Sequence, residues 1–515
     1  MNRIKHSVIL IWMVMPLILM GCNQGANSPI PIANQYTVAV ATHPENVGLI
    51  RINANPDDWG GGGWVGAESL AVDPHSEVQI EMRGMVGYSF EGWYEGTVLL
   101  SHDRILSFIA MGNRSIHARF SIVEASGSSR IHPEDLVYMG AFLTPSWITD
   151  PQSWEWGGRS MAFNRDGNPF GRGDGLKGSI FGSGNAQHNW ISEISIPRPV
   201  YSVSRSISDL PIAQTLQPFA DVKGSLFPWI ADIPRVGMEI LPPQMTPQGL
   251  QDASKLYLCW GSHLQYGHYH THMWCETDLT NPQPQGPWRV KGMNEYNSND
   301  YLFAIPEVWS NVNAPGMRLA TGRFRDGGAS GFGPTLAAVG PWNHGNPPAA
   351  GSLLDSVPLI LYSNNLDGIP DPYYAMNGYA ESDEWEGGAW LTTGNQSAVL
   401  FVGTKGLGDT WYGDPHGPCL ECDLRGWWST SFESWFLFYD ADDLAKVALG
   451  IIQPYEPQPY AFLNVDDILF HRQGNQHKHL LGACSYDSDN HLLFVFEIGR
   501  GDGQRTLVHV WKVHH

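Results

Sequence analysis

Along residues 36–120, apolar and polar residues alternate in short runs such as YTVAVA, GLIRINA and EVQIEM, which are separated by Gly, Asn and Pro. A period of two places successive side chains on opposite faces of a strand, so this pattern predicts short β-strands joined by turns. We therefore expect a small β module in this part of the chain.

The larger part of the chain, residues 130–515, repeats one order of strands five times. Each unit begins with a strand led by small residues, turns into an apolar strand and ends on a third strand. The units span residues 158–197, 237–279, 316–341, 387–444 and 480–513. Up-and-down units of this kind, with no helical period between them, predict a β-propeller. Five blades are favoured. Six or seven are the alternative, because these units are longer than common propeller repeats.

Two short segments complete the predicted ring. VYMGAF at residues 137–142 is expected to supply the outer strand that joins the last unit, and only residues 440–450 read as a helix. The fold class is thus all-β, a small module followed by a β-propeller.

The chain opens with an export signal. Arg3 and Lys5 precede the 13-residue apolar run Val8–Met20, which is too short to span a bilayer and suits the core of a signal peptide. The run ends in LMGC, which resembles a bacterial lipobox. That resemblance implies that Cys22 is lipidated and begins the mature chain, while an ordinary secretory signal with an incidental cysteine is the alternative. Asn23 follows Cys22 instead of Asp, which favours the outer membrane in a Gram-negative host.

Composition shifts mark the remaining boundaries. A polar stretch with two prolines reads as a tether, and a Ser/Gly-rich stretch reads as a linker. The expected segments are a signal peptide at 1–21, a tether at 22–35, the small module at 36–120, a linker at 121–129 and the propeller at 130–515.

Two strings in the small module, GYSFEGWY at 87–94 and MGNRSIHARF at 111–120, resemble the internalin-type B-repeat of secreted bacterial proteins. The resemblance implies a β-grasp-like fold and a role as spacer or adhesion module, and it brings over no catalytic residue. The glycine-rich stretch at 59–71 departs from the pattern, because the family has a shorter turn there.

Charge narrows the set of partners. The chain has 30 Lys and Arg against 51 Asp and Glu, a formal net charge of −21. Such an acidic protein is not expected to bind nucleic acid, whose phosphates require a basic face. It is also not expected to dock on anionic lipid through its own charge, so the membrane is reached through the acyl chains on Cys22.

The segment CWGSHLQYGHYHTHMWC is the densest in candidate chemistry. In an extended strand, His268, His270 and His272 share one face. Three such imidazoles can bind a transition metal or supply a general acid and base, and an exposed ladder of His and aromatic residues is the structural alternative. Tyr266, His268 and His270 are candidate catalytic residues here, and Trp274 is a candidate ligand contact.

The cysteines of an exported protein favour disulfides. A hairpin centred midway between Cys259 and Cys275 would place them opposite each other as a cross-strand disulfide. Cys419 and Cys422 are expected to close a small loop, with half of a zinc site as the alternative. Cys484 is left over as a buried thiol.

Arginines are informative in a chain so poor in cations. Arg323 and Arg325 lie two residues apart in RFRDGGASGFGP, so in an extended chain both point to the same side. Two arginines on one side favour an anionic or carboxylate ligand. Arg323 is therefore added to the candidate catalytic residues. Salt bridges to the many acids are the alternative interpretation. Arg159 and His188 lie at corresponding strand ends of the first unit, and His188 is a candidate ligand contact.

Acidic residues offer a second kind of chemistry. Glu381, Asp383, Glu384 and Glu386 precede or begin the fourth unit's inner strand. Paired carboxylates can hydrolyse a glycosidic bond, and a set of carboxylate oxygens can bind calcium. A solvated acidic loop is the alternative. Glu239 is the one acid expected to face the channel from within an inner strand.

Together these observations predict a lipid-anchored protein of the cell envelope whose β-propeller binds an extracellular ligand, a glycan. The alternative is a carbohydrate-active enzyme, either a polysaccharide lyase using His, Tyr and Arg or a glycoside hydrolase using paired carboxylates. That alternative rests on architecture and not on a full motif. A metal ion is an optional cofactor, and the reaction is not specified.

Overall fold

The computed structural model of the chain describes most residues after position 34. The described ranges are 35–54, 65–85, 88–122, 130–145, 150–168, 175–228, 230, 235–262, 269–293, 298–323, 332–362, 374–413, 426–500 and 504–514. Strands dominate these ranges, with only two α-helices, α1 (Glu307–Asn313) and α2 (Ala441–Ala448). The all-β expectation is confirmed. Neither helix is long and apolar enough to cross a membrane.

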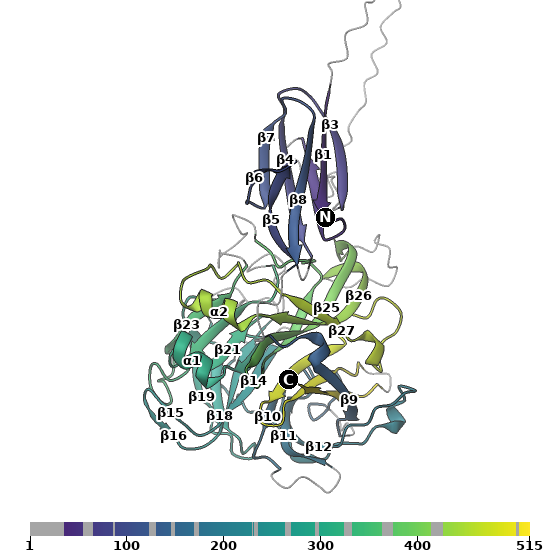
Figure 1. The fold of residues 1–515 in the computed structure, drawn as a ribbon. Coiled ribbons are helices and arrows are strands. Elements are labelled where there is room, and N and C mark those ends of the chain that lie inside the picture. The colour runs from purple at the N-terminus through teal and green to yellow at the C-terminus, as the bar shows by residue number, and fades with distance from the viewer. Residues whose placement is uncertain are drawn as a thin grey trace, which may run out of the picture.

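A small module stands on a larger body (Figure 1). Its strands form a five-stranded sheet and a three-stranded sheet. The first sheet runs β3 (Ala67–Val72), β1 (Tyr36–His43), β8 (Arg114–Ile122), β5 (Tyr88–Glu95) and β6 (Val98–Ser101), and the second runs β2 (Gly48–Asn53), β4 (Glu77–Gly84) and β7 (Ile105–Ile109).

The two sheets of this module share one core. Val38 and Ile116 come from the first sheet and Ile50 and Ile80 from the second, and all four side chains are buried in the same cluster. Period-two alternation buries one face of each sheet, so the two apolar faces cover each other. The described residues of the module contain no helix. The β-grasp-like fold implied by the resemblance is therefore corrected to a sandwich of two sheets.

The larger body contains five arrays of four antiparallel strands. The first has β10 (Met161–Asn164), β11 (Gly175–Ser183), β12 (Ile191–Pro197) and β13 (Thr215–Ala220). The second has β14 (Arg235–Leu241), β17 (Lys255–Gly261), β18 (His272–Glu276) and β19 (Gln285–Val290). The third has β20 (Tyr301–Ala304), β21 (Leu319–Gly322), β22 (Leu336–Gly340) and β23 (Leu353–Ile360). The fourth has β24 (Glu384–Thr393), β25 (Gln396–Tyr412), β26 (Trp427–Tyr439) and β27 (Ala461–Asn464). The fifth has β28 (Leu481–Asp487), β29 (Leu492–Glu497), β30 (Leu507–Val513) and β9 (Leu136–Leu143).

Smaller elements connect these arrays. The strands β15 (Gln244–Thr246) and β16 (Gly249–Gln251) form a two-stranded ribbon. Parallel pairing of β19 with β23 joins the second and third arrays into one eight-stranded sheet. The end strands of this sheet, β14 and β20, contact each other, so the sheet nearly closes on itself as a barrel.

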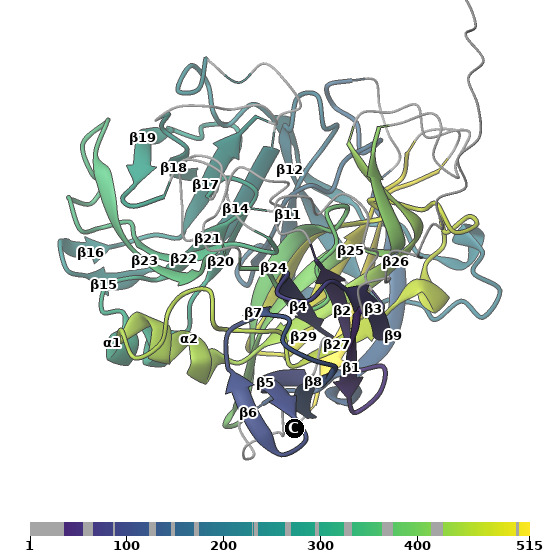
Figure 2. The same cartoon turned by 90° about the horizontal axis from the view of Figure 1, so that it is seen from above.

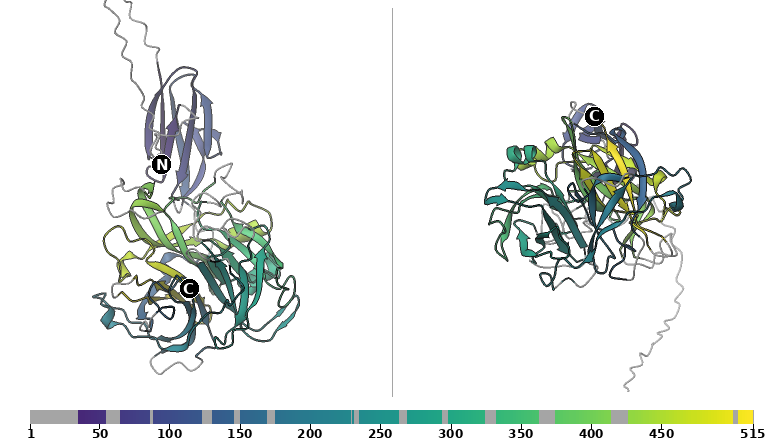
Figure 3. Two further views of the ribbon diagram at one scale, coloured as in Figure 1. Left: turned by 180° about the vertical axis from the view of Figure 1, so that it is seen from behind. Right: turned by 90° about the horizontal axis from the view of Figure 1, so that it is seen from below.

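The first strands of the five arrays meet in a ring. In order, β10, β14, β20, β24 and β28 each contact the next, and β28 contacts β10. The arrays lie around a common centre in the view of Figure 1 and, from behind, in the left panel of Figure 3, while Figure 2 shows the same elements from above. Each of the five units predicted from the sequence overlaps one array, but the unit at 316–341 misses β20, the inner strand of the third array, and the first, second and fourth units miss the last strand of theirs. The predicted outer strand at 137–142 is also confirmed, because β9 pairs antiparallel with β30.

Small residues let the inner strands approach closely. A Cβ atom on Gly237 would lie 2.7 Å from the Cα atom of Tyr301, and one on Gly387 would lie 2.7 Å from the backbone nitrogen of Cys484. A pocket of only about 10 Å³ lies among these inner-strand residues. The two ends of the ring are therefore separate surfaces.

The strand register corrects the predicted disulfide. In the β17–β18 pair, Cys259 lies opposite His272 and Leu256 lies opposite Cys275. The register is shifted by three residues from the one that would bring the cysteines together, and both are buried free thiols. Cys484 is a buried free thiol, as predicted. Cys22 and the Cys419–Cys422 pair lie outside the described residues.

Candidate functional site

One end of the ring gathers ionisable side chains. Every inner strand begins beside such a residue: Arg159 two residues before β10, Arg235 at the start of β14, Asp300 one residue before β20, Glu384 at the start of β24 and His479 two residues before β28. We call the following residues the charged cluster: Arg159, Arg235, Glu384, Glu386, Lys478, His479 and Arg500.

Glu386 is the centre of this cluster. Its Oε1 atom lies 2.7 Å from Nη1 of Arg159, and its Oε2 atom lies 3.0 Å from Nη1 of Arg235. Burial alone would raise the pKa of the Glu386 carboxyl, but the charges of Arg159 and Arg235 outweigh it and hold that pKa well below its usual range. Glu386 is therefore a permanently ionised, fixed carboxylate and not a general acid.

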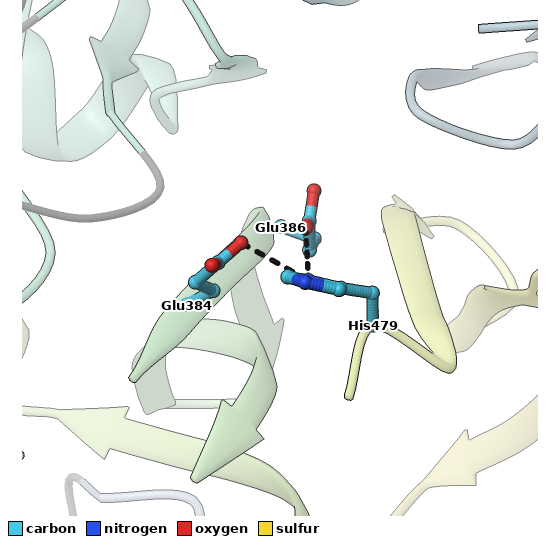
Figure 4. Close-up of side chains that lie close together, drawn as sticks. All are labelled: Glu384, Glu386 and His479. Carbon is cyan, nitrogen blue, oxygen red and sulfur yellow. Dashed lines mark ion pairs between the residues drawn. The ribbon is translucent and has the colours of Figure 1, made fainter. Parts of the chain in front are cut away.

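His479 bridges two carboxylates (Figure 4). Its Nδ1 atom lies 3.0 Å from Oε2 of Glu384 and 3.4 Å from Oε1 of Glu386. His479 adopts a φ of +56°, an uncommon left-handed conformation for a residue other than glycine. Its backbone N–H is held by Oγ1 of Thr404 at 2.9 Å. Local backbone strain of this kind is often stored at functional sites.

Basic side chains outnumber the acids of the cluster. Lys478 Nζ lies 3.5 Å from Oε1 of Glu384, and the Arg500 guanidinium donates to the Lys478 carbonyl. Burial, together with the nearby charge of Arg159, lowers the pKa of Arg500 to about 10. Like charges are thus close together here, and an anionic ligand would relieve their repulsion.

Aromatic side chains lie beside the cluster on the hairpin of β25 and β26. Trp411 pairs with Trp428 and Tyr412 with Trp427 across this hairpin. Lys478 connects the hairpin to the cluster, because its Nζ donates to the Trp427 carbonyl at 2.7 Å and lies 5.0 Å from the centre of the Trp428 ring. Tyr412 is 57% exposed. The site therefore combines positive charge with accessible aromatic surface.

Three side chains of the cluster can also serve as metal ligands. One donor atom each from Glu384, Glu386 and His479 lies within 4.8 Å of the others, the only such group in the described part of the chain. Two ligand atoms that each lie about 2.1 Å from a divalent ion are roughly 3.0–3.4 Å apart. The distances from Nδ1 of His479 to the two carboxylate oxygens fall in this range. A metal ion here competes with Arg159, however, which already holds Oε1 of Glu386.

The predicted histidine face is divided by the structure. His272 is buried, with Nδ1 2.8 Å from Oγ1 of Thr271 and Nε2 3.1 Å from Oγ1 of Thr321. Both ring nitrogens therefore face hydroxyl groups. Burial lowers the pKa of His272 to about 3. His270 is partly buried, while Tyr266 and His268 lie outside the described residues.

The other predicted contacts are spread over the body. Arg323 is 2% exposed, with Nη1 3.3 Å from Oδ1 of Asn299 and Nε 4.0 Å from Oδ2 of Asp300, which agrees with the salt-bridge interpretation. Trp274 is buried beneath Lys255, whose Nζ lies 4.7 Å from its ring centre. His188 is exposed on the turn between β11 and β12. Arg325 lies outside the described residues.

The acids that the sequence singled out fall into separate places. Glu384 and Glu386 belong to the charged cluster, but both are buried and not part of a solvated loop. Asp383 is buried and paired with Lys405, whose Nζ lies 2.8 Å from Oδ1. Glu239 lies at the opposite end of the ring, as described below.

Sequence reasoning missed Arg235, Lys478, His479 and Arg500. The available signal was positional. Arg235 begins the apolar run RVGMEIL, and Lys478 and His479 stand directly before LLGACSY. A charged residue at the start of each inner strand of a ring points to the ring end, where such strands converge.

Comparison with protein-family models finds no match for this chain, and comparison with curated proteins finds no significant match. The functional argument therefore rests on the site itself.

Proposed function

We propose that this protein is an exported, lipid-anchored glycan-binding protein that holds an acidic saccharide at the charged cluster. The observation that carries the proposal is the excess of positive charge around Glu386 beside the aromatic hairpin of β25 and β26. Arginine forks bind carboxylates with two parallel hydrogen bonds. Aromatic faces offer apolar surface on which a sugar ring can pack.

The architecture proposed for this role is a five-bladed β-propeller. Support comes from the ring of five inner strands and from β9, an early strand that completes the last array. Lipidation of Cys22 would place the protein in the cell envelope, in the outer membrane of a Gram-negative host. The small module, with its resemblance to the B-repeat, would hold the propeller away from the membrane.

Binding to a glycan panel tests the proposal. Polygalacturonate and alginate are compared with a neutral dextran by calorimetry on the full chain. We expect the uronate polymers to bind, with an affinity that falls as salt is added, and dextran not to bind. Binding that does not distinguish acidic from neutral polymers would overturn the proposal.

Two variants locate the binding. Arg159→Gln removes one charge from the cluster, and Tyr412→Ala removes exposed aromatic surface without opening a core. Each is expected to weaken binding about tenfold, the cost of one charged hydrogen bond or one packed ring. Tyr201→Ala is the matched control, since Tyr201 is 61% exposed and packs against Tyr138 of β9, not against the charged cluster. Equal losses in all three variants would contradict the assignment.

Catalysis is the second candidate, and His479 is the observation that favours it. An imidazole that is held between two carboxylates and remains 25% exposed is positioned to take a proton from a bound substrate. A lyase would release unsaturated uronates, which absorb in the ultraviolet. Product that forms with the natural chain but not with His479→Gln, while binding is retained, would establish the enzyme.

A further inference from the structure

A cavity of about 330 Å³ opens at the end of the ring opposite the charged cluster. All five inner strands contribute to it at or near their carboxyl ends. Representative lining residues are Asn164 of β10, Glu239 of β14, Ala304 of β20, Trp390 of β24 and Ser485 of β28. Its volume lies within the range of about 300–1,000 Å³ that small-molecule sites occupy.

Glu239 is the ionisable side chain at the base of this cavity. Its Oε1 atom accepts the backbone N–H of Ile240 at 2.8 Å, and its Oε2 atom accepts that of Ala304 at 3.1 Å. Burial raises the pKa of the Glu239 carboxyl to about 8 in spite of these two amide donors. Near neutral pH the group is mainly protonated, so it has an O–H to donate.

The other charges around the cavity are already compensated. Nη2 of Arg165 lies 2.7 Å from Oδ2 of Asp489, and Nη1 of Arg318 lies 3.4 Å from Oε2 of Glu307. Asp487 accepts hydrogen bonds from the backbone of Asp489 and from the backbone and side-chain amides of the following asparagine. Arg165, Glu307, Arg318, Tyr486 and Asp487 line the cavity together with Glu239, Tyr257 of β17 lies opposite Glu239 in the strand register, and Cys484 of β28 is close enough to sense its charge. The cavity therefore places no demand for net charge on a ligand.

Apolar surface and hydroxyl groups complete the lining. Trp390 and Phe303 lie on adjacent inner strands, and Trp390 is braced by Trp309 at a ring-centre distance of 4.7 Å. Ser485 and Tyr486 also line the cavity, where the Ser485 hydroxyl accepts the backbone N–H of Phe163 at 3.0 Å and the Tyr486 hydroxyl donates to the Thr392 carbonyl. A few polar groups set into apolar walls are characteristic of sites for small polar molecules.

We propose that this cavity is a second binding site, which takes a neutral, hydroxyl-rich small molecule such as a single hexose and to which the protonated Glu239 donates a hydrogen bond. The inference goes beyond the function proposed above. It concerns the other end of the ring and a neutral ligand, and the closed ring centre separates the two sites.

Calorimetry on the full chain with the methyl glycosides of glucose, galactose and mannose tests this site. We expect at least one glycoside to bind, about tenfold more weakly at pH 9 than at pH 6, because deprotonation of a group with a pKa near 8 removes the donor. Glu239→Gln keeps an N–H donor at this position, although its amide nitrogen cannot accept the backbone N–H that one carboxyl oxygen accepts, so it should still bind the glycoside and lose the pH dependence. Glu239→Leu should lose binding at least tenfold while keeping the native circular dichroism.

Glu95→Gln is the matched control, because Glu95 also pairs with an arginine, Arg114, and is 39% exposed, but belongs to the small module and does not line the cavity. It should keep both the binding and its pH dependence. The inference is overturned if none of the three glycosides binds, if Glu239→Leu binds like the natural chain, or if Arg159→Gln abolishes the binding. Acidic-polymer binding at the charged cluster can succeed or fail independently of these results.

Discussion

Arg159 and Glu386 join the first and fourth arrays at one end of the ring, with Nη1 of the arginine 2.7 Å from Oε1 of the carboxylate. Glu386 is only 2% exposed, while Arg159 keeps 18% of its side chain accessible. Pairing charges out of water seldom adds much stability, because the desolvation cost offsets the attraction. The pair is better understood as a means of fixing a guanidinium at the accessible edge of the charged cluster.

Breaking this pair should be costly even though forming it gains little. Glu386→Gln leaves Arg159 and Arg235 facing a neutral amide, and we expect a loss of about 3–5 kcal/mol in the free energy of unfolding. Urea unfolding followed by tryptophan fluorescence measures it. The control is Glu307→Gln, an exposed acid with one arginine partner, expected to change stability by about 0.5 kcal/mol or less. Similar losses in both variants would contradict the central role of Glu386.

The pKa of Glu239 makes a separate prediction for stability against pH. A carboxyl whose folded pKa is raised binds its proton more tightly in the folded chain than in the unfolded chain. Its contribution to stability is therefore complete below about pH 4.5 and declines as the pH rises to about 8. Relative to the natural chain, Glu239→Gln should have a less negative slope of unfolding free energy between these values. Parallel slopes for the two proteins would show that Glu239 is ionised in the fold.

Much of the fold follows from local pattern, and little of the site does. Alternating apolar residues in GLIRINA and EVQIEM predicted β2 and β4, and VYMGAF predicted the strand that pairs with β30. These predictions were possible because the alternation of buried and exposed positions in a strand can be recognised within a few residues. Arg235 and His479 both reach Glu386 only because distant strands start at the same end of the ring. A single sequence does not record such convergence.

The register of the β17–β18 pair could not be predicted from the sequence either. The symmetric positions of Cys259 and Cys275 suggested a disulfide, yet pairing depends on the turn between the strands, and Cys259 faces His272 instead. The resemblance in the small module likewise identified strands but not their division into two sheets.

The corrected register predicts the behaviour of the thiols. Cys259, Cys275 and Cys484 are buried, and burial raises the pKa of Cys275 to about 12 and that of the other two higher still. Because only the thiolate reacts, all three should resist alkylation in the folded chain and react fully after unfolding without reductant. Peptide mapping by mass spectrometry checks this. A peptide linking Cys259 to Cys275 would show that the predicted disulfide forms after all.

The packing of β9 against the segment at Val200 can be tested at one glycine. Gly140 lies in β9 opposite Val510 of β30, its φ is +120°, and a Cβ atom there would lie 2.3 Å from the carbonyl carbon of Val200. Gly140→Ala should therefore cost about 3 kcal/mol or more, combining backbone strain with a clash that only backbone movement relieves. Gly474→Ala is the control for a positive φ without a clash. Its φ of +62° lies in the left-handed region that residues other than glycine can adopt, and nothing lies within 4 Å of the new atom, so about 1–2 kcal/mol is expected. Equal costs for the two variants, measured by urea unfolding, would mean that β9 does not pack against Val200 and Tyr201 as the structure has it.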